Sequence, residues 1–95
     1  MEKEKKDLTL IVKKRWFDMY LSGEKREDYR EIKDYWKKRL TTKDGLFKEF
    51  DKVIIKNGYG KNAPKLVFKH YYTYIGIGYE ELGATKDECF IIYVN

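Results

Sequence analysis

The chain has 95 residues, of which 42% are hydrophobic and 39% charged, and it carries a formal net charge of +5. This length favours a single domain over residues 1–95, with residues 1–7 as a flexible leader, and the positive charge favours anionic partners such as RNA or nucleotides. No apolar run is long enough for a signal peptide or a transmembrane helix, so we expect no membrane partner and a cytoplasmic location.

The first half of the chain predicts two strands and two short helices. Residues 8–12 are aliphatic and β-branched, which is typical of a strand. Residues 14–21 follow a helical period, and Gly23 is a helix stop. Residues 25–30 then look extended, and residues 33–40 form a short helix with its basic residues near the end, as the helix dipole favours.

The second half predicts strands and turns. Residues 50–56 read as a strand that ends in a loop dense in turn formers, residues 57–64. Residues 65–77 are rich in β formers but long for one strand, so they bend or split in two. After a connector over residues 79–84, residues 88–94 form the last strand. Five or six strands and two short helices indicate an α+β fold whose strands curl into a small β-barrel.

The charged strand at residues 25–30 is the most informative segment. Period-2 alternation places Arg26, Asp28 and Arg30 on one face, so this face presents a cation, an acid and a cation, which suits an anionic ligand. Tyr29 then faces the other way, into the core. Two other interpretations stay open: an edge strand protected by its charges, or a structural ion network between Asp28 and Arg30.

Metal and nucleotide-hydrolysis chemistry have little support. The chain has one cysteine, Cys89, and one histidine, His70, which cannot supply the usual zinc ligands. Cys89 lies in the terminal strand pattern, where a buried structural thiol is the ordinary outcome. Residues 57–61 lack the first glycine and the Ser or Thr of a Walker phosphate loop. We therefore expect no metal and no cofactor.

Together, these segments resemble the ASCH domain family. The residues that carry the resemblance are the helix over residues 15–21, Ser22-Gly23-Glu24-Lys25, Asp28-Tyr29-Arg30, Asn57-Gly58-Tyr59-Gly60 and Phe90-Ile91-Ile92. The match spans residues 8–95, and Asp28 replaces the usual Glu. The resemblance implies a PUA-like barrel that binds RNA or nucleotides in a cleft between the barrel and the first helices.

Some ASCH proteins resemble amidohydrolases that remove the acetyl group from N4-acetylcytidine. In that branch the expected machinery is a Lys that matches Lys25, a Thr nucleophile at the position of Asp28, and a distant Glu, for which Glu80 and Glu81 are the candidates here. Since Asp28 supplies a carboxylate in place of the hydroxyl, acyl transfer through a Thr nucleophile is not expected.

The predicted site is a basic cleft lined by Lys25, Asp28, Arg30, Asn57 and Tyr59. Its ligand is RNA, a nucleotide or a nucleoside, because an amide reads a base edge and a tyrosine ring stacks on a base. The asparagine and glycines of the loop are equally typical of turn chemistry.

Three further residues lie outside this set. Lys61 and Lys65 would extend a phosphate track beyond the loop, and Arg26 would add charge at the rim. The alternative function is a small hydrolase acting on a modified nucleoside or on RNA, with Lys25 and Asp28 as the acid–base pair. A third possibility is an interaction module that has no ligand.

Overall fold

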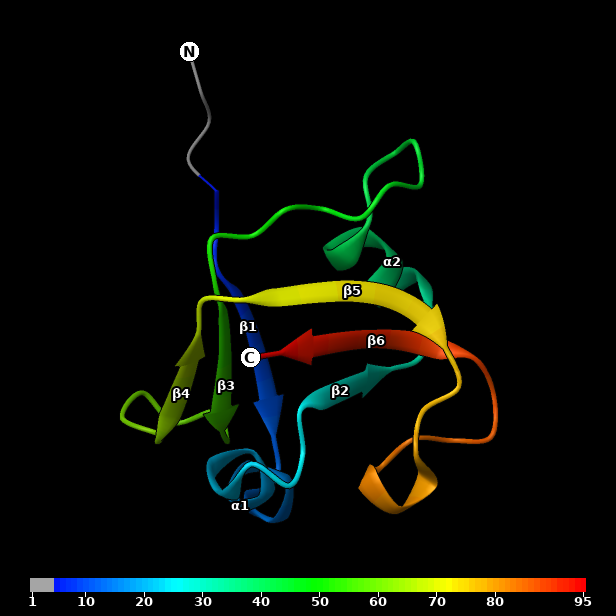
Figure 1. Ribbon diagram of the computed structural model, residues 1–95. Helices are drawn as coiled ribbons and strands as arrows, with labels where there is room; N and C mark the ends of the chain where they lie inside the picture. Colours follow the sequence, from blue (N-terminus) through cyan, green and yellow to red (C-terminus); the bar gives the residue numbers. More distant parts are fainter. Residues whose placement is uncertain (1–4) are drawn as a thin grey trace. The chain divides into compact units, whose positions relative to one another are not determined.

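The computed structural model describes residues 5–95, which form an α+β fold with six strands in two sheets and two α-helices (Figure 1). The chain divides into two compact units, each assembled from separate stretches of sequence. Of the described residues, the first unit comprises residues 5–26, Phe50–Tyr71 and Val94–Asn95, and the second comprises Glu27–Glu49 and Tyr72–Tyr93.

The first unit contains a three-stranded sheet and helix α1. Its elements are β1 (Leu8–Val12), α1 (Lys14–Ser22), β3 (Val53–Asn57) and β4 (Lys65–Phe68). The strand order is β1-β3-β4, with β1 parallel to β3 and β3 antiparallel to β4 (Figure 1). A parallel pair needs a crossover connection, and the long stretch between β1 and β3 supplies it.

Alternation along β1 and β3 produces one buried face and one outer face. The buried side chains of these strands are Leu8, Leu10, Val53 and Ile55. Helix α1 packs on this face, because its Phe17 and Tyr20 are buried and the Tyr20 ring lies 6.4 Å from that of Phe68. Residues at alternate positions, such as Lys56, therefore point outward.

The second unit contains the other sheet. Its elements are β2 (Glu27–Arg30), α2 (Asp34–Leu40), β5 (Tyr71–Gly76), the 3₁₀-helix η1 (Glu80–Leu82) and β6 (Cys89–Val94). Only the end residues Tyr71 and Val94 of these strands belong to the first unit. The strand order is β2-β6-β5, and β2 runs antiparallel to β6 (Figure 1). Strand β6 is buried from Cys89 to Ile92, which explains its continuous apolar sequence, since a central strand is covered on both faces.

These elements agree with the sequence prediction to within about three residues at each end. The long β-rich segment splits, since β4 ends at Phe68 and β5 begins at Tyr71. Gly23 ends α1 as expected: its φ of 87° is left-handed, and its N–H donates to the Tyr20 carbonyl. The strand pairing gives two three-stranded sheets, and neither closes on itself, so the barrel remains a prediction.

Part of the predicted leader has defined contacts. Residues 1–4 lie outside the described residues. The Lys6 carbonyl accepts a hydrogen bond from the Asp51 N–H at 2.9 Å, and the Asp7 carboxylate lies 3.7 Å from the Lys52 amine. Over residues 5–95, no helix is long and apolar enough to span a membrane.

Candidate functional site

Lys25 follows α1 in the first unit and is buried, with 4% of its surface exposed. Its backbone N–H donates to the Met19 carbonyl at 3.0 Å, which fixes the turn after the helix. Its ammonium nitrogen lies 5.1 Å from the ring centroid of Trp16 and 5.6 Å from that of Tyr20. Aromatic faces attract a cation at this range, so the rings of Trp16 and Tyr20 stabilise the charged ammonium group of Lys25.

Asp28 and Arg30 form an ion pair in the second unit. The Asp28 side chain is 4% exposed, and its two oxygens accept hydrogen bonds from Arg30 Nε and Nη2 at 2.5 and 3.1 Å. The guanidinium carbon of Arg30 also lies 4.7 Å from the ring centroid of Trp36. Bidentate geometry of this kind is among the strongest that charged side chains make. The structural interpretation of this pair, which the sequence left open, therefore has direct geometric support.

The orientation predicted for Tyr29 is wrong. Asp28 is the buried residue of β2, at 3% exposure, and Tyr29 is only half-buried. Asp28 tolerates burial because Arg30 neutralises its charge. The sequence pattern assigned the apolar ring to the core and could not anticipate this compensation.

Glu27 is the centre of a hydrogen-bond network that sequence reasoning missed. The hydroxyls of Tyr29 and Tyr74 donate to its two carboxylate oxygens at 2.8 and 2.6 Å, and the Tyr79 N–H donates to the Tyr29 hydroxyl at 3.3 Å. Burial raises the pKa of Tyr29 above its ordinary value, and the hydrogen bond to Glu27 raises that of Tyr74. The spacing of Glu27 and Tyr29 was visible in the sequence, but Tyr74 joins them only through the strand order β2-β6-β5.

The loop after β3 combines turn chemistry with an exposed ring. The Asn57 N–H donates to the Pro64 carbonyl at 2.9 Å, and Gly58, whose φ is 89°, donates to the Val12 carbonyl at 3.2 Å. Tyr59 is 86% exposed. The loop glycine therefore serves a turn with positive φ, and Tyr59 presents its ring at the surface.

A basic pocket lies on the outer face of the first unit's sheet. Its volume is about 410 Å³, and its lining residues are Thr9, Ile54, Lys56, Lys61, Asn62, Ala63 and Lys65. Lys56 and Lys65 stand directly opposite each other in the β3–β4 pair. We call this site the sheet pocket. The sequence pointed to Lys61 and Lys65, but it did not single out Lys56, whose partner depends on the strand register.

The five predicted site residues divide between the two units. Lys25, Asn57 and Tyr59 belong to the first unit, and none of them lines the sheet pocket. Asp28 and Arg30 belong to the second unit, where the ion pair joins them. The five-residue cleft therefore remains a prediction.

The remaining candidate residues are Glu80, Glu81, His70 and Cys89. Glu80 and Glu81 are exposed in η1, and His70 is exposed just before β5. The Cys89 thiol is buried, and this burial raises its pKa, which disfavours the reactive thiolate. Over residues 5–95, no three His, Cys, Asp or Glu side chains gather closely enough to hold a metal ion.

Comparison of the chain with protein-family models, with curated proteins and with solved structures gave no match. Membership of the ASCH family therefore remains a proposal that depends on the motif residues.

Proposed function

We propose that this protein is an RNA- or nucleotide-binding domain of the ASCH type, which holds its ligand through phosphate groups. A PUA-like barrel and a cytoplasmic location belong to the same proposal. The observation that carries it is the pair of lysines that face each other in the sheet pocket, Lys56 and Lys65.

Lys56 and Lys65 repel each other in the absence of an anion. Residues directly opposite in an antiparallel pair have Cβ atoms about 5 Å apart, and like charges at this spacing destabilise the sheet. A phosphate group between the two amines turns this repulsion into attraction. Lys61 adds a third cation from the loop, the Asn62 amide adds polar groups, and no acidic side chain is among the lining residues.

The same loop supplies a surface for a base. Lys61 and Asn62 line the sheet pocket, and Tyr59, two residues earlier than Lys61, exposes 86% of its surface. A base stacked on an exposed aromatic ring gains about 1–3 kcal/mol, independent of its identity. Phosphate binding beside an exposed tyrosine favours single-stranded RNA over a small inorganic anion.

The geometry favours binding over hydrolysis. An acid–base role for Lys25 and Asp28 needs groups that reach a substrate, yet Lys25 is buried beside two aromatic rings, and both oxygens of Asp28 accept hydrogen bonds from Arg30. The test is to incubate the wild type and Asp28→Asn with N4-acetylcytidine and with labelled RNA. If the wild type hydrolyses either substrate and Asp28→Asn does not, a hydrolase becomes the better proposal.

The binding proposal is tested by fluorescence anisotropy with a labelled oligouridylate. The test variant is Lys56→Ala/Lys65→Ala. The control is Lys14→Ala/Lys86→Ala, which removes two exposed lysines that lie outside the sheet pocket.

For single strands the salt slope is about 0.7 per phosphate contact, so at 0.1 M salt two lost contacts lower the affinity about 25-fold. We expect this loss in the test variant and a much smaller one in the control. Absence of wild-type binding, or equal losses in both variants, contradicts the proposal.

A further inference from the structure

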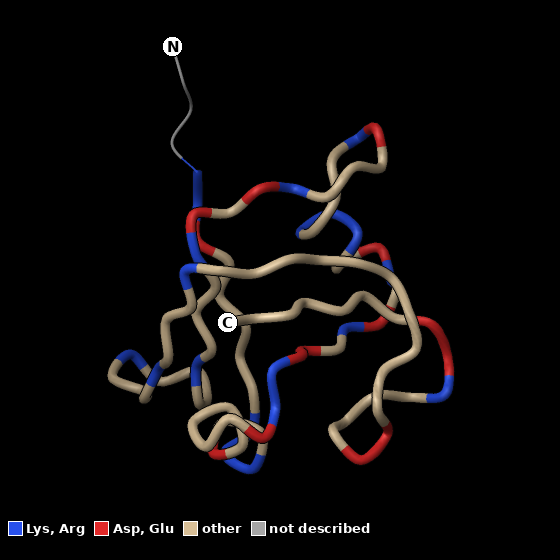
Figure 2. The backbone as a smooth tube through the Cα atoms, in the orientation of Figure 1, with Lys and Arg blue, Asp and Glu red and all other residues tan. Residues whose placement is uncertain are grey.

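A second basic pocket lies in the second unit, where α2 ends. Its volume is about 520 Å³, and its lining residues are Lys37, Lys38, Thr41, Thr42, Lys43 and Lys48. Four of the six carry a positive charge and none is acidic. Figure 2 shows the basic residues that crowd the second half of α2. We call this site the α2 pocket. Sequence reasoning attributed the basic residues of the helix only to the helix dipole and did not single out Lys43 or Lys48.

Backbone hydrogen bonds preorganise the loop that forms one wall of the α2 pocket. The Thr42 N–H donates to the Leu46 carbonyl at 2.7 Å, and the Gly45 N–H donates to the Thr42 carbonyl at 3.0 Å. Gly45 has a φ of 79°, which a residue with a side chain rarely adopts. The Lys48 N–H donates to the Leu40 carbonyl at 2.8 Å, which closes the base of the loop. A pocket built on such a loop loses little entropy when a ligand binds.

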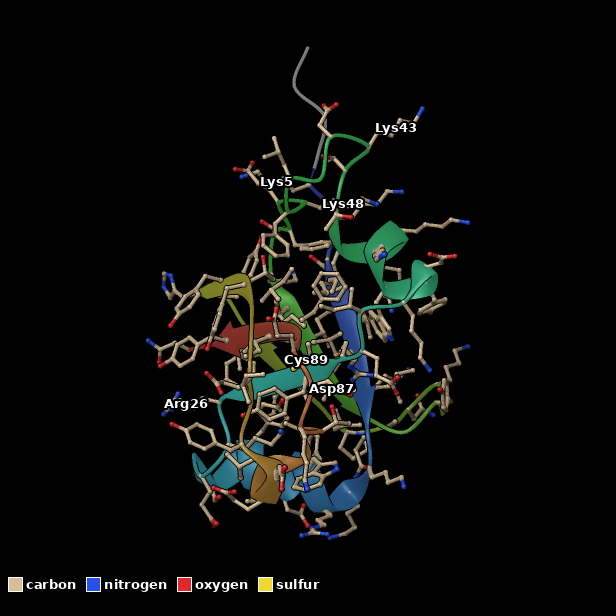
Figure 3. All side chains as sticks on the ribbon, turned by 90° about the vertical axis from the view of Figure 1, so that its right-hand side faces the viewer. Lys5, Arg26, Lys43, Lys48, Asp87 and Cys89 are labelled. Atoms are coloured by element: carbon tan, nitrogen blue, oxygen red, sulfur yellow. The ribbon has the colours of Figure 1, made fainter. Side chains whose placement is uncertain are left out.

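The carbonyls of Lys37 and Lys38, near the end of α2, already accept hydrogen bonds from the protein, which weakens their repulsion of an anion. The Lys37 carbonyl accepts hydrogen bonds from the N–H and the hydroxyl of Thr41 at 2.9 and 2.5 Å. The Lys38 carbonyl accepts one from the Lys48 amine at 2.7 Å. Figure 3 shows Lys43 at the tip of the loop and Lys48 at its base. The Lys48 ammonium keeps two more N–H donors for a ligand.

Among residues 5–95, no salt bridge compensates the lysine charges of the α2 pocket. Within the described part of the chain, neither Lys37 nor Lys43 takes part in a salt bridge. Four ammonium groups in one pocket repel one another, and an anion with several negative oxygens relieves this repulsion. The pocket chemistry therefore matches phosphate groups.

Exposed aromatic surface adjoins these charges on α2. Tyr35 is 62% exposed, and the Arg39 guanidinium lies 5.8 Å from its ring centroid and 5.0 Å from that of Trp36. Aromatic and guanidinium planes beside a cationic groove are typical of proteins that bind single strands. A free polyphosphate would use the lysines alone, whereas RNA would use both features.

We propose that the α2 pocket binds phosphate groups of single-stranded RNA, as a second anion site in addition to the sheet pocket. The assignment to RNA rests on the proposed function. The assignment to phosphate rests only on the lysines of the pocket.

Titration of the ¹⁵N-labelled protein with tripolyphosphate tests the phosphate assignment. We expect saturable shifts of the amide signals of residues 41–43, and at least tenfold weaker binding in Lys37→Ala/Lys43→Ala. These two amines make none of the hydrogen bonds that hold the loop, so the variant should stay folded. The control is again Lys14→Ala/Lys86→Ala. No shift at residues 41–43 in the wild type, or the same affinity in both variants, overturns the assignment.

Anisotropy with labelled oligouridylate tests the assignment to RNA. We expect Lys37→Ala/Lys43→Ala to bind about 25-fold more weakly than the wild type at 0.1 M salt. This figure follows if each of the two lost phosphate contacts lowers the slope of log Kobs against log[salt] by about 0.7. Tripolyphosphate binding with unchanged RNA affinity means that the pocket takes free polyphosphate, and the RNA assignment is then wrong. If the wild type binds no RNA, the proposed function fails together with this assignment, and the tripolyphosphate titration still decides whether the pocket holds phosphate.

Discussion

Arg30 holds both oxygens of the Asp28 carboxylate, through Nε at 2.5 Å and Nη2 at 3.1 Å. The side chains are 20% and 4% exposed, so the pair is largely shielded from water. A shielded pair behaves differently from a surface pair, because water compensates poorly for the loss of one of its two charges.

We expect Asp28→Asn to lower the free energy of unfolding by about 3 kcal/mol, since it removes the buried carboxylate charge that the Arg30 guanidinium pairs with. The matched control is Asp18→Asn, because Asp18 pairs with Lys14 at 2.6 Å but both side chains are more than half exposed. That change should cost less than about 1 kcal/mol. Urea denaturation of the two variants measures the difference. Equal losses would mean that the Asp28 pair contributes no more than a surface pair.

The placement of Asp28 illustrates what the sequence could predict. Alternation correctly put Asp28 and Arg30 on the same face of β2, and the chain order of strands and helices was correct. The pattern could not tell which face is buried, because an acid buried with a bidentate arginine looks in sequence like an exposed charge. Because the charged face was assigned to the cleft, alternation assigned Tyr29 to the core.

The two basic pockets are a second feature that the sequence could not predict. Lys56 and Lys65 are nine residues apart across a turn-rich loop, and only the register of β3 and β4 places them opposite each other. Lys43 and Lys48 meet the lysines of α2 because hydrogen bonds fold the intervening loop. Net charge predicted an anionic partner, but the positions at which the charges gather depend on tertiary structure.

Gly78 lies against the Tyr29 ring, and this contact predicts a stability effect. A Cβ atom on Gly78 would collide with the ring edge of Tyr29 and would lie 2.8 Å from the Cβ of Ala84. We expect Gly78→Ala to cost about 1–3 kcal/mol, as overpacking usually does. At Gly60 the nearest atoms to an added Cβ, those of Ala63, are 4.0 Å away, so Gly60→Ala should be close to neutral. Thermal melts compare the stability of the two variants. If Gly78→Ala is as stable as the wild type, the packing of Tyr29 against Gly78 is wrong.

The tyrosine–glutamate network predicts sensitivity to alkali. The pKa of Tyr29 is raised by burial and that of Tyr74 by its hydrogen bond to Glu27, both from an ordinary value of 10.0. Since the folded state favours the neutral phenols, these groups stabilise the protein fully below pH 10.0, and this stability is lost as the pH rises through their higher folded pKa values.

Ultraviolet titration of phenolate absorbance measures this effect. In the folded wild type, Tyr29 and Tyr74 should keep their protons above pH 10.0, which difference spectra against Tyr29→Phe and Tyr74→Phe reveal. Glu27→Gln keeps an acceptor but removes the charge, so Tyr74 should then ionise at lower pH. Ionisation of both groups at the ordinary value in the folded wild type would contradict the network.

The salt dependence of RNA binding by the wild type tests most directly the proposal that the protein binds RNA through its phosphate groups. The association constant for an oligouridylate is measured over a series of KCl concentrations. The three lysines of the sheet pocket, Lys56, Lys61 and Lys65, predict that log Kobs falls with log[KCl] with a slope of about −2 or steeper, at about 0.7 per phosphate contact on a single strand. A slope near zero, or no detectable binding at low salt, would contradict it.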